Sequence, residues 1–360
     1  MRVSAVEVIP YALRFAKPYV SARGALERRE MALVRIATDE GADGLGEAVP
    51  LTLRGGAALG AVVAELRRAG AELAGAELDE GAVDPGPRRR LAAGLSAPAT
   101  AALEIARLDL AGKLVGAPLW RLLGAARQAP VRCNATLSAG PADHVAAAAE
   151  RWAELGFDSF KLKVGTGDDA SLVEAVRRTL GPAARVRVDA NGAWSAPEAA
   201  ARLAAIEAAG IELAEQPAPT LEELAEVRAG TSIPIAADES VATAGDASHA
   251  RKLGACDVAT IKLAKVGGIG AARAIAGIVP SYLSSALDGP VGIAAAAHLA
   301  QVLPASEASY GLAHGLATQL LFADSVARTE CEVRAGLLHL PEGPGLGVEL
   351  DPTALMRARI

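Results

Sequence analysis

Charged residues recur at a nearly constant spacing through the middle of this 360-residue sequence. Lys163, Asp189 and Glu215 are separated by 26 residues each, and Asp238 and Lys262 follow at intervals of 23 and 24 residues. Each stands at or near the end of a short apolar run that is typical of a β-strand. A strand, a helix and two loops occupy about that length in a βα unit. The spacing therefore predicts consecutive βα units, each with a charged side chain at the same end.

Three of these residues are carboxylates that we expect to converge, namely Asp189, Glu215 and Asp238. Carboxylates on adjacent strands repel one another, so a bound cation is needed to hold them together. A set of oxygen ligands without His or Cys favours a hard ion, Mg²⁺ first and Mn²⁺ second. The sequence therefore predicts a metal site at the carboxyl ends of adjacent strands.

Lysine is scarce in this sequence and is concentrated near the carboxylates. Only seven of the 36 cationic residues are lysines, and four of these lie in the segments 161–163 and 262–265. Lysine, unlike arginine, can lose its proton when it is buried near other positive charges. Lys161 and Lys163 share one face of a strand, and Lys262 comes from a later strand. We therefore expect a lysine base that removes the α-proton of a small-molecule carboxylate bound to the metal.

The elements that must position these residues are those of a barrel. Eight units over roughly 200 residues match a (β/α) barrel, in which the carboxyl ends of all strands share one mouth. A doubly wound sheet is the alternative, but no phosphate-binding glycine fingerprint follows the first apolar run. The predicted strands lie in the runs 131–137, 159–164, 185–190, 211–216, 233–239, 258–264, 281–287 and 308–313.

Two further segments flank the predicted barrel. The first fifty residues favour strands followed by a glycine-rich turn at 42–50, and residues 56–124 favour helices, so this part resembles a small α+β domain. The end of the chain contains short extended pieces and turns that we expect to return to this domain. The predicted parts are therefore an α+β capping domain at 1–125, a barrel at 126–325 and a C-terminal segment at 326–360.

Composition excludes several classes of function. The chain is 51% hydrophobic with a net charge of −6, so nothing in it indicates a nucleic-acid partner or an anionic membrane surface. Charged residues interrupt every apolar stretch before it reaches the length of a membrane span. The cysteines Cys133, Cys256 and Cys331 are odd in number and scattered, which favours a reducing cytoplasm over a disulfide framework or zinc site.

Over nearly its whole length the sequence resembles the muconate-lactonizing-enzyme subgroup of the enolase superfamily. The resemblance implies an α/β fold with a modified TIM barrel beneath an N-terminal α+β capping domain. It implies that Asn191 and Glu239 lie just outside the three metal ligands. Lys163 matches the family's base, Lys161 its neighbour and Lys262 the lysine on the opposite face, whereas Lys265 is expected not to be catalytic. The segments that carry the resemblance are GADGLGEAVP, ALEIARLDLAGKLVGAPLWRLLG, FDSFKLKVG, RVDANGAW, AEQP, IAADES and TIKLAKVGGI.

Within the subgroup, the later barrel is most similar to o-succinylbenzoate synthases. The similar segments are 284–300, 315–326 and 341–351. Ser284 falls where those enzymes have a serine that contacts the succinyl carboxylate, and Ser285 follows it. The resemblance implies a lyase that uses Mg²⁺ to eliminate water from a cyclohexadiene carboxylate, giving o-succinylbenzoate for menaquinone biosynthesis.

Other functions remain open at this point. A racemase or epimerase of N-acylamino acids or dipeptides, or a muconate-type cycloisomerase, would use the same lysine pair. Asp324 stands without the acidic partner that dipeptide epimerases show near the end of the barrel. Arg23 and Arg54 could bind a second carboxylate or be exposed. A metal-binding barrel without catalysis is the most remote alternative, and we expect a homo-oligomer.

Overall fold

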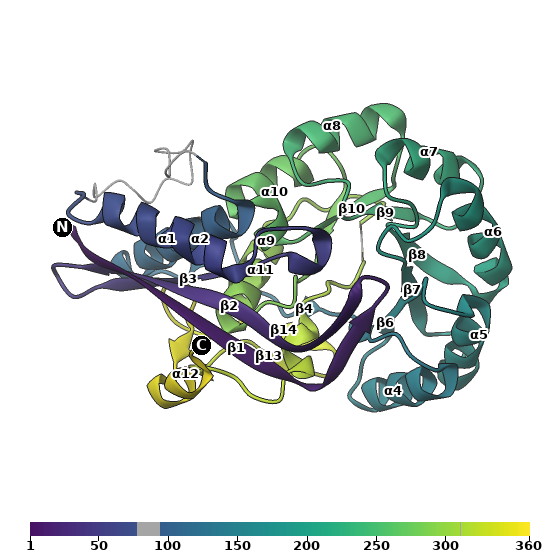
Figure 1. Cartoon of the computed structure of the whole chain (residues 1–360), viewed down its shortest axis with the longest axis horizontal. Helices are drawn as coiled ribbons and strands as arrows, with labels where there is room; N and C mark the ends of the chain where they lie inside the picture. Colours follow the sequence, from purple (N-terminus) through teal and green to yellow (C-terminus); the bar gives the residue numbers. More distant parts are fainter. Residues whose placement is uncertain (78–93, 310) are drawn as a thin grey trace.

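The structure of the protein is a computed structural model that describes residues 1–77, 94–309 and 311–360. It has an α/β fold in which a curled parallel sheet lies beside an N-terminal capping domain (Figure 1). The fold class expected from the sequence is therefore confirmed. The predicted helical region 56–124 lies partly outside the described residues, and the side chain of Arg54 also lies outside them.

The capping domain begins with a three-stranded antiparallel sheet of order β1-β2-β3. The glycine-rich segment 42–50, expected to be a turn, instead contains the whole third strand. Gly44 and Gly46 explain the difference, because a Cβ at either position would collide with the backbone of the helix that packs on this strand. The elements are β1 (Val3–Ser21), β2 (Gly24–Thr38), β3 (Asp43–Ala48), η1 (Thr52–Arg54), α1 (Leu59–Leu73), α2 (Ala97–Leu114) and α3 (Leu119–Leu122).

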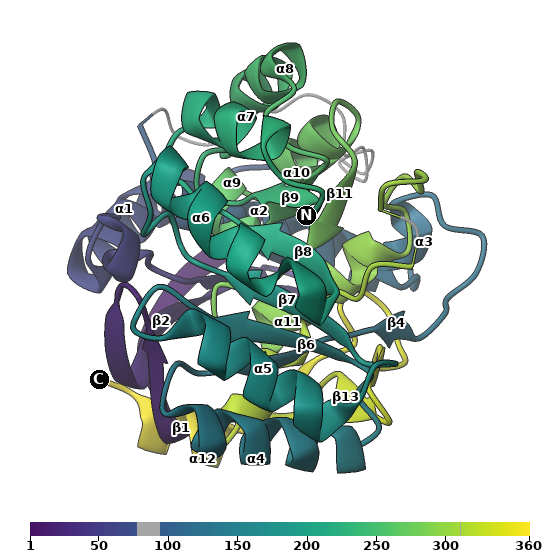
Figure 2. The same cartoon turned by 90° about the vertical axis from the view of Figure 1, so that its right-hand side faces the viewer.

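In the described part of the chain, seven parallel strands form the barrel sheet, in the order β11-β10-β9-β8-β7-β6-β5. Helices cover its outer face (Figure 2). The strands are β5 (Ala135–Leu137), β6 (Ser159–Lys163), β7 (Arg185–Asp189), β8 (Ile211–Glu215), β9 (Ile235–Ala237), β10 (Val258–Ile261) and β11 (Ser281–Leu283). The helices are α4 (Ala142–Glu154), α5 (Asp169–Leu180), α6 (Ala196–Ile206), η2 (Glu207–Ala209), α7 (Leu221–Ala229), α8 (Ala244–Leu253), α9 (Leu263–Val266), α10 (Ile269–Ala276) and α11 (Pro290–Ala300). No helix in the described part of the chain is long and apolar enough to cross a membrane.

The barrel closes without the eighth strand that we expected at 308–313. Within that run the described residues form turns and coil, and residue 310 lies outside them. Closure instead comes from two isolated bridges just downstream, where His314 pairs with Cys133 and Gly315 pairs with Ser284. The sequence prediction placed this edge too early because two bridging residues leave no apolar alternation to detect.

The C-terminal segment contacts both other parts of the molecule. The hairpin β13 (Glu332–Arg334) and β14 (Leu337–His339) pairs with β4 (Val131–Arg132) at the start of the barrel. The chain then ends beside the capping domain, where the N–H of Ile360 donates to the carbonyl of Pro10 at 3.3 Å. The remaining elements are η3 (Ala317–Leu321), β12 (Ala327–Thr329), β15 (Glu349–Leu350) and α12 (Pro352–Ala358).

Candidate active site

The regularly spaced charged residues meet at one end of the parallel sheet. Lys163, Asp189 and Glu215 are the last residues of β6, β7 and β8. Asp238 and Lys262 directly follow β9 and β10. All five side chains are buried. Parallel strands of a barrel open towards one mouth, so the strand-end placement read from the sequence brings these groups together.

Lysines link the first two carboxylates. Nζ of Lys161 lies 2.8 Å from Oδ2 of Asp189 and 2.6 Å from Oε2 of Glu215. Nζ of Lys163 lies 2.6 Å from the same Asp189 oxygen. Lys161 and Lys163 lie two residues apart in β6 and therefore point to the same side of the sheet.

The third carboxylate is held by two more lysines. Lys262 donates a hydrogen bond to Oδ2 of Asp238, and its Nζ lies 3.9 Å from Oε1 of Glu215. Lys265 lies 3.0 Å from Oδ1 of Asp238 and donates to the carbonyl of Thr260 at 2.9 Å. Lys265 was not expected in the site, because it comes after the strand, in the short helix α9. That helix turns its ammonium group back to Asp238.

Asn191 connects the lysine side of the site to Glu239. Its Oδ1 accepts from Lys163 at 3.0 Å, and its Nδ2 donates to Oε1 of Glu239 at 3.0 Å. Its backbone N–H also donates to Oδ1 of Asp189 at 3.0 Å. Asn191 has a φ of 50° and Gln216, after the next strand, has a φ of 40°. Left-handed residues other than glycine are often found at functional sites, where the surrounding structure offsets their strain.

The buried charges shift one another's pKa in opposite directions. Burial alone would raise the pKa of Asp189, but Lys161 and Lys163 outweigh it and hold that pKa well below its usual range. Burial would lower the pKa of Lys163, but the charge of Asp189 raises it. The lowered lysine pKa expected from the sequence presupposes a divalent cation, whereas the carboxylates by themselves favour the ammonium form.

The donor set suits a hard cation. The three carboxylates supply only oxygen atoms, which Mg²⁺ and Mn²⁺ prefer. Oε1 of Glu215 is buried and has no hydrogen-bond partner among the described residues. Because lysines lie between the carboxylates, no group of three acidic, His or Cys side chains in the described ranges forms a ready coordination shell. The fit of Asp189, Glu215 and Asp238 to a bound cation rests on their oxygen donors and on the unpartnered Oε1 of Glu215.

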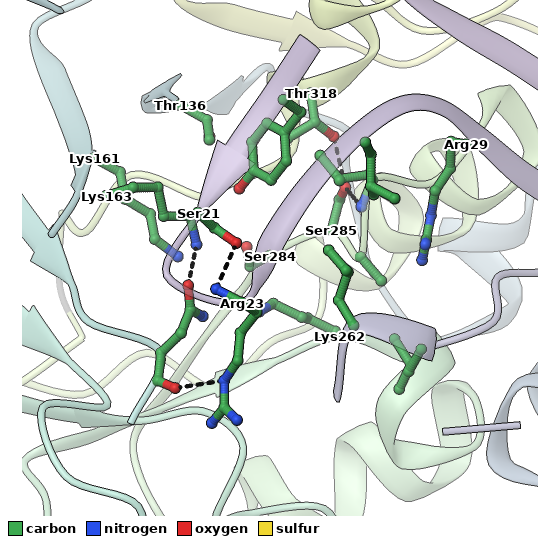
Figure 3. Close-up of a pocket in the computed structure, with 17 residues that line it drawn as sticks. Ser21, Arg23, Arg29, Thr136, Lys161, Lys163, Lys262, Ser284, Ser285 and Thr318 are labelled. Carbon is green, nitrogen blue, oxygen red and sulfur yellow. Dashed lines mark hydrogen bonds between the residues drawn. The ribbon is translucent and has the colours of Figure 1, made fainter. Parts of the chain in front are cut away.

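A pocket above these charges is shared by the barrel and the capping domain (Figure 3). Ser284 and Ser285 line it as the sequence indicated, and Oγ of Ser285 accepts from the N–H of Leu287 at 2.8 Å. Arg23, in the turn between β1 and β2, reaches across the pocket and donates to the carbonyl of Asn191 at 2.9 Å. Pocket residues that the sequence did not indicate include Tyr19, Ser21, Arg29, Thr136 and Thr318. Nothing in their local sequence distinguishes them.

Two family descriptions match most of the chain. Residues 4–124 match the mandelate racemase and muconate lactonizing enzyme N-terminal domain. Residues 143–354 match the enolase C-terminal domain-like family. The chain belongs to the enolase superfamily, in its muconate-lactonizing-enzyme subgroup. The resemblance found in the sequence is therefore confirmed.

Relatives within this superfamily differ in their reactions. Muconate cycloisomerase 1 of Rhodococcus opacus is 32% identical to this chain. The match covers 99% of this chain and 98% of the relative. The o-succinylbenzoate synthase of Thermobifida fusca is 43% identical over a match that covers 63% of this chain and 74% of the relative. A crystal structure of the dipeptide epimerase of Enterococcus faecalis with Mg and L-Leu-L-Tyr has a TM-score of 0.88 and 30% identity, covering 97% of this chain and 100% of that one. Membership of the superfamily therefore does not select one reaction.

Proposed function

We propose that this enolase-superfamily chain eliminates water from a cyclohexadiene carboxylate to give o-succinylbenzoate. The observation that carries the proposal is that Lys163, Lys262 and the serine pair after β11 line the same pocket. The lysines suit α-proton removal, and Ser284 and Ser285 offer hydroxyl groups to a second carboxylate of the substrate. The similarity to the Thermobifida fusca o-succinylbenzoate synthase supports this choice of reaction.

The residues of the pocket divide the reaction between them. Lys163, as the neutral amine, takes the α-proton, and Lys262 places positive charge near the enediolate that results. The β-hydroxyl then leaves with the proton that Lys163 returns, so that one water is lost and the ring becomes aromatic. Mg²⁺, held by Asp189, Glu215 and Asp238, would supply positive charge. This charge would stabilise the substrate carboxylate after its α-proton has been removed. Asn191, which accepts from Lys163 at 3.0 Å, orients the base.

A racemase or epimerase of N-acylamino acids or dipeptides is the second candidate. Lys163 ends β6 and Lys262 follows β10, and three strands separate β6 from β10 in the sheet. This placement suits two bases acting on opposite faces of one α-carbon. The similarity to the Mg-bound dipeptide epimerase supports this reading. A muconate-type cycloisomerase is supported by the Rhodococcus opacus relative.

Three assays on the same preparation separate these candidates, the third of them the conversion of muconate to its lactone. With Mg²⁺ present, we expect the absorbance of the cyclohexadiene substrate to fall, with product formation confirmed by mass spectrometry. In parallel, N-succinylamino acids and dipeptides are incubated in D₂O, and α-proton exchange is followed by NMR. Exchange without any dehydration contradicts the proposal and favours the racemase or epimerase. No reaction in the first two assays, with muconate converted to its lactone, favours the cycloisomerase.

A further inference from the structure

Glu215 accepts a hydrogen bond inside the barrel from a tyrosine of another strand, β11. Oη of Tyr282 donates to Oε2 of Glu215 at 2.7 Å. Tyr282 belongs to β11 and Glu215 to β8, and two strands separate these in the sheet order. The hydrogen bond therefore crosses the barrel interior, where Tyr282 is only 1% exposed.

The direction of this hydrogen bond is set by a threonine. Oγ1 of Thr260 donates to Oη of Tyr282 at 2.8 Å, so the phenol oxygen accepts from one side and gives its own proton to Glu215. A tyrosine hydroxyl has one proton to donate, and the threonine leaves the carboxylate as its acceptor.

A buried arginine holds the ring of Tyr282. The guanidinium of Arg187 lies 5.2 Å from the centre of the ring, a distance typical of a cation–π contact. Arg187 is fully buried, and its Nε lies 2.6 Å from Oε2 of Glu212 while its Nη1 donates to the carbonyl of Ala313 at 2.7 Å. The arginine is itself fixed, so the ring has little freedom to move away from Glu215.

The two oxygens of Glu215 therefore have different surroundings. Oε2 receives the Tyr282 hydroxyl and lies 2.6 Å from Nζ of Lys161. Oε1 has no hydrogen-bond partner in the part of the chain that the structure describes, and it lies 3.9 Å from Nζ of Lys262. We propose that Tyr282 is a positioning residue that holds Oε2 so that Oε1 is presented to a divalent cation. This inference rests on the metal site of the proposed function.

The test is the binding of Mn²⁺, which needs no substrate. Tyr282→Phe removes the hydroxyl and keeps the ring that Arg187 contacts. We expect the dissociation constant for Mn²⁺, measured from the EPR signal of the free ion, to rise about tenfold, as is common when a partner of a metal ligand is lost. Titration calorimetry with Mg²⁺ is expected to show the same shift. Thr260→Val, which removes the donor to the phenol oxygen, is expected to weaken binding less.

Tyr11→Phe is the matched control. Tyr11 is also fully buried and also donates its hydroxyl to a carboxylate, in this case Oε2 of Glu47 at 2.9 Å. The Tyr11→Phe variant should lose about as much stability as Tyr282→Phe, and its affinity for Mn²⁺ should be unchanged. A dissociation constant of Tyr282→Phe within twofold of the wild-type value overturns the inference, as does a wild type that binds no Mn²⁺. Wild type that binds Mn²⁺ but converts no carboxylate contradicts the proposed function alone.

Discussion

Two buried clusters of carboxyl groups in this protein have opposite electrostatics. In the barrel mouth, Asp189 lies within 2.8 Å of the ammonium groups of Lys161 and Lys163. At the seam between the capping domain and the barrel, Glu47 accepts from the hydroxyl of Tyr11 at 2.9 Å and from the N–H of Gly289 at 2.6 Å. Neither of these two donors to Glu47 carries a full positive charge.

The pKa values follow this difference. The lysines lower the pKa of Asp189 despite its burial. Burial, helped by the nearby Asp288, raises the pKa of Glu47 to about 8, and the hydrogen bonds from Tyr11 and Gly289 only partly oppose it. Complete burial by itself therefore does not decide whether a carboxyl group is ionised, because a paired cation reverses the effect. The lysines of the mouth favour the ionised form of Asp189, whereas burial at the seam favours the protonated form of Glu47.

The largest expected effect is on catalysis in the mouth. Lys163→Ala removes the base, and we expect the turnover number to fall by about 10³-fold or more. Stability should change little, because Lys161 still pairs with Asp189. Steady-state kinetics and thermal denaturation measure the two effects, with the exposed Lys252→Ala as control. Retained turnover in Lys163→Ala would remove this lysine from the role of base.

Asp238→Asn tests whether the mouth needs its negative charge. The variant leaves the buried ammonium groups of Lys262 and Lys265 without this carboxylate. We expect loss of Mg²⁺ binding and a free energy of unfolding lower by about 3 kcal/mol. Calorimetry and urea denaturation measure these changes. Asp257→Asn, in a partly exposed ion pair with Arg228, should cost about 1 kcal/mol or less and leave Mg²⁺ binding intact. Equal effects of the two variants would contradict the comparison.

Glu47→Gln tests the seam through its pH dependence. The Glu47 carboxyl has a pKa of about 8 in the folded protein and an ordinary value of 4.5. Its raised pKa therefore adds to the free energy of unfolding in full below pH 4.5, and this contribution is lost as the pH rises to about 8. Between pH 5 and 8 we expect the unfolding free energy of the wild type to fall relative to that of the variant by about 2 kcal/mol or more. Urea denaturation across this range measures it. Parallel curves for the two proteins would show that Glu47 does not take up a proton there.

Tyr11→Phe is expected to have the smallest effect. The hydroxyl of Tyr11 donates to Glu47 and lowers its pKa, so its removal should move the pH midpoint of the Glu47 effect upward. We expect a loss of about 1 kcal/mol in unfolding free energy, the usual contribution of one hydrogen bond. Denaturation of both proteins at several pH values measures the shift. A downward shift would mean that the hydroxyl does not act as the donor.

Much of the mouth could be predicted because its information is local in the sequence. A charged residue that ends a short apolar run is visible within a few residues, and the repeat of such runs indicates the barrel. The same reasoning failed for Lys265, whose approach to Asp238 depends on the turn of α9. It also failed for the closing edge, where His314 and Gly315 are the bridging residues in the part that the structure describes, and two residues are too few to show a strand pattern.

The sequence by itself determined the fold class and the family, and it indicated which charged residues gather at the mouth. These features depend on the spacing of apolar residues in strands and helices, which is visible among neighbouring residues of the sequence. Only the tertiary structure decided the partner of each charge. Tyr282 and Glu215 are 67 residues apart, and Glu47 and Gly289 are 242 apart. Contacts over such separations arise when the sheet closes and the capping domain docks, and no local pattern in the sequence records them.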